Sequence, residues 1–233
     1  MLLEVLYRIK AAPIEHLGCR SLVRLEAFHT GYGLFPFKKA KDFSFEAFRD
    51  WVLVLYRPTF GTASMSAIRI VRRLASSDDY AFDLFFDALD SALAANPDVL
   101  VKPLDRGFLT SEPPLPVSSF LDILTKRPMM FLPNSSASCL RAFLDGYCLA
   151  AMEEDHFECL DLDGFEHWVR EKLDLTGMFR WEDAVLSCLR GSEADAFYWA
   201  LTELKNFRAS KGPLPDRVYE VHLVTDAVDP GTQ

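Results

Sequence analysis

The histidines and cysteines, five of each, are the residues in this chain whose side chains most readily take part in chemistry. Four potential metal ligands lie close together in the sequence: His156, Cys159, Asp163 and His167. Their spacing would place them on one face of a continuous helix. The sequence of residues 161–164, D-L-D-G, is instead typical of a break. We therefore expect a loop and a helix start here, and no bound metal ion.

No recognisable catalytic motif accompanies these side chains. The chain has no nucleophile elbow, Walker loop, dinucleotide fingerprint or H-E-x-x-H sequence. A hydrolase needs a nucleophile, a base and an acid that orients the base, and no histidine lies in such a setting. His29 precedes Gly31 by two residues, and its counterpart in the second half of the chain is the apolar Leu144. The sequence therefore predicts no catalytic residue, no cofactor and a protein that is not an enzyme.

Acidic residues are concentrated in one segment. The 233 residues carry a formal net charge of −9, but residues 1–112 contain 14 basic and 14 acidic residues, so the whole excess lies in residues 113–233. Residues 153–166, here called the acidic segment, contain seven Asp or Glu and no Lys or Arg. Either general solubility or the steering of a basic partner explains this charge. The candidate partner-binding residues are Glu153, Glu154, Asp155, Phe157, Glu158, Asp161 and Asp163.

The composition also excludes several classes of protein. Net acidity argues against general binding to nucleic acid or to an anionic membrane surface, and no apolar run reaches the length of about 18 residues that predicts a membrane span. An odd number of cysteines without a C-x-x-C pair predicts free thiols and a cytoplasmic location. One basic run, Arg69, Arg72 and Arg73, occupies a single helical turn. It is either a solvated helix face or a contact for a phosphate or a partner carboxylate.

An internal duplication organises the chain. Residues 5–32 align with residues 120–147 at an offset of 115 without a gap, and both blocks contain the sequence A-F-x-x-G-Y. Residues 48–52 match residues 165–169 at an offset of 117, and residues 71–89 match residues 186–204 at an offset of 115. Three blocks in the same order at nearly one offset indicate two copies of one fold.

Two pairs of equivalent residues carry structural expectations. Gly31 and Gly146 each lie within a helical pattern, where Gly costs about 1 kcal/mol relative to Ala. We expect each glycine to allow close packing against a neighbouring helix. Trp51 and Trp168 are also equivalent, and we expect both to belong to the core rather than to a ligand site.

Apolar residues recur at helical spacing through both halves. The sequence therefore predicts an all-α fold of two tandem, structurally similar repeats of about five helices each. We expect the first repeat at 1–96, a proline-rich linker at 97–119 and the second repeat at 120–211. Alternating residue types at 218–223 favour a short strand or extended arm within a C-terminal tail at 212–233.

One pattern in the second half resembles a known family. Its residues are Arg127, Pro128, Met130, Ser136, Leu140, Phe143, Gly146 and Tyr147. It is similar to a family of small bacterial all-α proteins that open with an R-P-G-M-Y-like segment and continue with F-x-x-G-Y. Their acidic closing helix, A-F-x-x-F-F-x-x-L, is matched here by residues 81–89. Members are encoded beside polymorphic toxins and are read as candidate immunity proteins. The resemblance implies a toxin partner and transfers no catalytic residue.

Two classes of function remain in view. The sequence favours a cytoplasmic immunity or inhibitor protein that binds a basic cognate toxin and covers its active site. The alternative is a small-ligand-binding or catalytic protein with a pocket between the repeats that holds His29, His156 or Arg127. A structural adaptor is a third reading.

Overall fold

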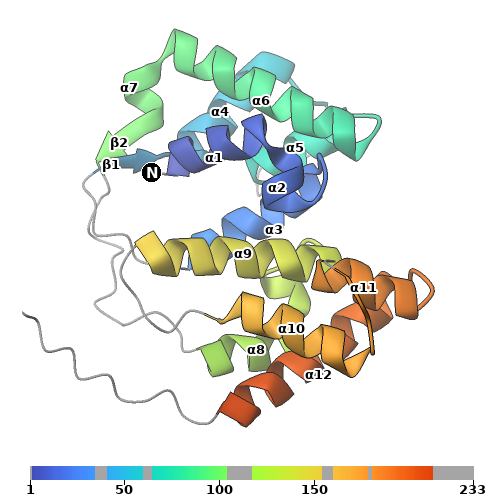
Figure 1. Ribbon diagram of the computed structural model, residues 1–233. Coiled ribbons are helices and arrows are strands. Elements are labelled where there is room, and N and C mark those ends of the chain that lie inside the picture. The colour runs from blue at the N-terminus through green and yellow to red at the C-terminus, as the bar shows by residue number, and fades with distance from the viewer. Residues whose placement is uncertain are drawn as a thin grey trace, which may run out of the picture.

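The computed structural model describes residues 2–34, 41–59, 65–103, 117–153, 160–177 and 180–211. Their regular secondary structure is helical apart from one short two-stranded ribbon, which confirms the all-α fold (Figure 1). The helices of the first half are α1 (Leu2–Ala11), α2 (Pro13–Leu17), α3 (Leu22–Tyr32), α4 (Phe45–Tyr56), α5 (Ala67–Leu74), α6 (Asp78–Ala95) and α7 (Pro97–Leu100). Those of the second half are α8 (Val117–Lys126), the 3-10 turn η2 (Pro128–Met130), α9 (Ala137–Glu153), α10 (Leu162–Lys172), α11 (Trp181–Cys188) and α12 (Glu193–Lys211).

Serine side chains begin most helices of the first half. Ser21, Ser44, Ser66 and Ser77 are the N-caps of α3, α4, α5 and α6, and each hydroxyl accepts a hydrogen bond from the backbone N–H three residues later. Arg57 ends α4 in the left-handed conformation, with φ of 41°, and a proline follows it. The local sequence therefore sets these helix boundaries, as the residue pattern predicts.

The two halves have their helices in the same order. α8, α9 and α12 each begin 115 residues after α1, α3 and α6, whereas the offset is 117 for α4 and α10 and 114 for α5 and α11. This correspondence agrees with the expected duplication. In Figure 1 the first half, coloured blue to green, lies above the second half, coloured yellow to red, and α3 and α9 lie between them.

The predicted linker contains more secondary structure than expected. Pro97 is the first residue of α7, where its missing N–H costs nothing. β2 (Val101–Pro103) then pairs antiparallel with β1 (Lys41–Phe43), and Phe43 lies opposite Val101. α8 already begins at Val117, so helices and a strand occupy both ends of the predicted linker at 97–119. Residues 104–116 and the predicted C-terminal arm at 212–233 lie outside the described residues.

α3 and α9 cross at two glycines. A Cβ atom added to Gly31 would lie 2.0 Å from the carbonyl oxygen of Phe143, and one added to Gly146 would lie 2.1 Å from the carbonyl oxygen of Phe28. These residues are equivalent in the duplication, so each helix presents the same atoms to the other, as in an isologous interface. Backbone therefore contacts backbone at the junction of the halves, and the expectation of close packing at both glycines is confirmed.

Candidate partner-binding site

The structure describes part of the predicted partner-binding site. Glu153 is the last residue of α9, Asp161 precedes α10, and Asp163 lies in its first turn. Four predicted residues lie outside the described part of the chain: Glu154, Asp155, Phe157 and Glu158. The structure therefore shows the positions of Glu153 and Asp161, which lie on either side of these four residues in the sequence.

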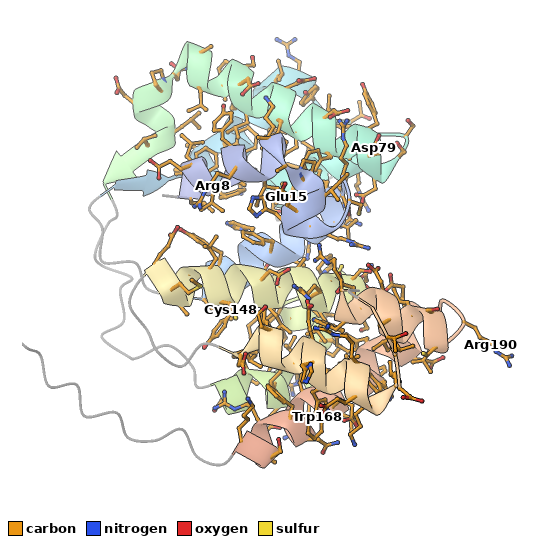
Figure 2. The ribbon with its side chains drawn as sticks, viewed as in Figure 1. Arg8, Glu15, Asp79, Cys148, Trp168 and Arg190 are labelled. Carbon is orange, nitrogen blue, oxygen red and sulfur yellow. The ribbon has the colours of Figure 1, made fainter. Side chains whose placement is uncertain are left out.

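Glu153 is bound to the first half of the chain. α3 is capped at Gly33, whereas α9 has Cys148 at the equivalent position and continues to Glu153. The Tyr32 hydroxyl donates a hydrogen bond to the Glu153 carboxylate at 2.6 Å. The guanidinium of Arg8, which Figure 2 labels on α1, lies 3.3 Å from the other oxygen of this carboxylate. This carboxylate therefore joins the two halves of the chain.

Asp161 starts α10. Its carboxylate accepts a hydrogen bond from the Gly164 N–H at 2.7 Å and lies 3.1 Å from Nζ of Lys211, at the end of α12. The hydrogen bond from Gly164 and the Lys211 charge hold the pKa of Asp161 below its usual value. The predicted break at residues 161–164 is thus a helix N-terminus. Asp163 is exposed in the next turn and can face a partner.

A cluster of five charged side chains includes Glu166, the last residue of the acidic segment, and joins three helices. Arg141 of α9 contacts Glu166, lies 2.8 Å from Asp145 and 3.7 Å from Glu182, and the Arg180 guanidinium lies 2.6 Å from Glu182. Glu182 is fully buried, and burial raises the pKa of Asp145 and of Glu182 against the opposing effect of the arginines. The cluster connects α9, α10 and α11, and sequence reasoning did not find it.

The first half has its own ion cluster with the charges exchanged. Glu26 of α3, equivalent to Arg141, is buried and accepts hydrogen bonds from Arg69 at 2.8 Å and from Arg72 at 2.9 Å. Two arginines of the predicted basic run therefore bind an internal carboxylate of the same chain. The opposite charges of Glu26 and Arg141 at the offset of 115 are the sequence signal that would have predicted both clusters.

The candidate catalytic residues do not converge. The His29 ring packs against Phe45 at a centroid distance of 3.9 Å, and its desolvation lowers its pKa to about 4. Arg127 is exposed after α8, and His156 lies outside the described residues. Within the described ranges, no group of three or more His, Cys, Asp or Glu side chains could hold a metal ion. His167 instead pairs with Glu171 at 3.2 Å on the surface of α10.

Comparison of the chain with protein-family models, curated proteins and solved structures gave no match. Among the helices in the described ranges, none combines the length and apolar character needed to cross a membrane. The function must therefore be argued from the geometry of the chain itself, and the resemblance to candidate immunity proteins stays a prediction.

Proposed function

We propose that this protein is an immunity or inhibitor protein that binds a cognate bacterial toxin and covers the toxin's active site. The observation that carries the proposal is the anchoring of the acidic segment at both ends. Glu153 is fixed to the first half by Tyr32 and Arg8, and Asp161 is fixed to the end of α12 by Lys211. Fixed ends reduce the conformational entropy that a binding segment loses on association.

The chemistry of the segment indicates a basic partner. The segment itself contains seven acidic residues and no Lys or Arg. Three of the acids, Glu153, Asp161 and Glu166, are paired with basic residues from elsewhere in the chain. The other carboxylates attract positive charge over roughly the Debye length of 10 Å at 0.1 M salt. A toxin that acts on nucleic acid or nucleotides has basic groups where phosphates bind. An acidic stretch in that position occupies the substrate site and blocks the reaction, and its association slows as salt is added.

The tight junction of the halves favours protein binding over a pocket between the repeats. At the crossing of α3 and α9, the atoms that a Cβ on Gly31 or Gly146 would meet are backbone atoms at about 2 Å. His29, a candidate for that pocket, packs against an aromatic ring. Three grooves on the described part of the chain, beside Arg170, Trp51 and Tyr198, are each lined by residues of one half only.

A charge-reversal experiment tests the proposal. Glu154→Lys, Asp155→Lys and Glu158→Lys are combined, and Glu153 and Asp161 are kept because they hold internal contacts. If the adjacent upstream gene encodes a secreted protein with a variable C-terminal domain, calorimetry measures binding to that domain, and growth during co-expression measures protection. We expect affinity to fall at least tenfold and protection to be lost.

The matched control reverses the same number of charges elsewhere. Glu15, Asp174 and Asp183 are exposed and lie outside the acidic segment, so their replacement by Lys changes net charge equally. This control should retain affinity and protection. Unchanged binding of the first variant, or an equal loss in both, would show that the acidic segment is not the binding site.

A further inference from the structure

A groove with a volume of about 220 Å³ lies beside Trp51 in the first half. Its lining residues are Ala47, Asp50, Trp51, Val54, Ala92, Asn96 and Leu100, from α4, α6, α7 and the residue between α6 and α7. Val54 is 68 % exposed and the adjacent Leu55 is 43 % exposed. The Trp51 indole N–H is buried and has no hydrogen-bond partner among the described residues. A buried donor without an acceptor costs about 1–3 kcal/mol, so an acceptor from outside would be favourable here.

The equivalent place in the second half is filled by the chain itself. The Trp168 indole donates a hydrogen bond to Glu203 of α12 at 2.9 Å (Figure 2). The Phe207 ring packs against Trp168 at a centroid distance of 5.9 Å, and Nζ of Lys172 lies 5.1 Å from the ring centre. An acceptor, an aromatic ring and a cation therefore surround this tryptophan.

The first half lacks all three groups. At offsets of 115 and 117, the counterparts of the acceptor, the ring and the cation are Ala88, Ala92 and Leu55. Ala88 cannot accept the Trp51 N–H, and Ala92 leaves the space that a phenyl ring takes in the other half. The groove beside Trp51 thus has the shape and the unpaired donor of a site whose internal occupant is missing.

The surrounding charge indicates what fills it. Helices α4, α6 and α7 contain eight acidic residues and one basic residue, Arg49, which pairs with Asp50. Three of the eight, Asp79, Asp83 and Asp90, pair with Arg20 or Lys10 from outside these helices, so the net charge near the groove stays negative but is smaller than the count alone. Asp50 lines the groove and its side chain is 62 % exposed. Beyond Val54, burial and the nearby Asp87 carboxylate raise the pKa of Tyr56, which places a second acid near that end of α4.

We propose that this groove docks a protein segment in which an aromatic side chain is flanked by Lys or Arg. The ring fills the space beside Ala92, a backbone carbonyl of the segment accepts the Trp51 N–H, and the basic residues face Asp50 and its acidic neighbours. This surface lies on the first half, so the proposal rests neither on the acidic segment nor on the identity of a toxin.

NMR of the full-length, ¹⁵N-labelled chain tests the proposal through the indole N–H signals of its four tryptophans. The probe is a blocked peptide, Lys-Lys-Phe-Lys-Lys, with Lys-Lys-Ala-Lys-Lys and Glu-Glu-Phe-Glu-Glu as controls. The Trp51 signal, assigned by its loss in Trp51→Phe, should move with the first peptide only, and the Trp168 signal should stay in place. No movement, or equal movement with the acidic peptide, would overturn the proposal.

Surface variants separate docking from unfolding. Val54→Glu with Leu55→Lys installs the residues of the second half, Glu171 and Lys172, at exposed positions and should weaken peptide binding at least tenfold. The reciprocal change, Glu171→Val with Lys172→Leu, is the matched control and should bind like the wild type. Equal affinity of all three chains would overturn the proposal.

Two further variants identify the occupant. Ala92→Phe supplies the missing ring from within the chain and should abolish the response to the peptide. If this variant does not fold, the Val54→Glu, Leu55→Lys variant tests the proposal instead. Residues 104–116 contain one aromatic residue, Phe108. A response that appears only after Phe108→Ala would assign the groove to the chain's own linker, and the proposal of an external partner would be wrong.

Discussion

Alanine at Gly31 tests whether the glycine crossing holds the two halves together. Its Cβ would lie 2.0 Å from the Phe143 carbonyl oxygen and 2.9 Å from the carbonyl carbon. Ordinary contact requires roughly 3.5 Å, so α3 and α9 must separate by about 1 Å or more. Overpacking of this kind costs about 1–3 kcal/mol, and a backbone carbonyl cannot rotate away, so we expect about 3. Improved helix propensity returns about 1 kcal/mol, which leaves a net loss near 2 kcal/mol.

Urea unfolding followed by circular dichroism measures this loss. Gly33→Ala is the control, because Gly33 is exposed at the end of α3 and the nearest atom to its added Cβ is 3.3 Å away. It should change the free energy of unfolding by less than about 0.5 kcal/mol. Equal stability of Gly31→Ala and Gly33→Ala would refute the reasoning.

The double variant Gly31→Ala, Gly146→Ala adds a sharper test. Because a single separation of α3 and α9 relieves both clashes, the double variant should lose less stability than the sum of the single variants, by about 1 kcal/mol. Strict additivity would show that the two glycines do not share one contact.

Three more predictions concern single side chains. Tyr32→Phe should cost about 1.5 kcal/mol in urea unfolding, because it removes a hydrogen bond to the Glu153 carboxylate; an unchanged unfolding midpoint would contradict that contact. Asp161→Asn keeps an acceptor for the helix cap but removes the charge. Since the folded-state pKa of Asp161 is lowered, the wild type loses this stabilisation as pH falls from the unfolded value near 4 through the lower folded-state pKa. The free energy of unfolding of the variant should therefore depend less on pH in this acidic range. The same pH dependence of unfolding free energy in wild type and variant would contradict this role of the Asp161 charge. Burial raises the pKa of Cys139 to about 11, so mass spectrometry should find Cys188 but not Cys139 labelled by a thiol reagent in the folded chain; rapid labelling of Cys139 would contradict its burial.

Much of the fold could be predicted because its signals are local. A serine such as Ser44 accepts a hydrogen bond from an N–H three residues away, so the capping residue and the first turn of its helix are neighbours in the sequence. The β1–β2 ribbon gives no such signal. Each strand has three residues without apolar alternation, and its hydrogen bonds come from a partner about 60 residues distant. The contact of Glu153, at the end of α9, with Tyr32 gives no local signal either, because the two residues are 121 positions apart.

By itself the sequence determined the helical class and predicted a repeat with close packing at Gly31 and Gly146, because periodicity and propensity belong to consecutive residues. Only the tertiary structure showed the internal partners of two acidic residues. Glu153 and Asp161 read as members of one acidic segment, yet each is paired with a group at least 50 residues away. Periodicity tells which face of a helix is apolar. It does not tell which distant donor or cation a polar side chain meets, since that depends on how helices from both halves pack.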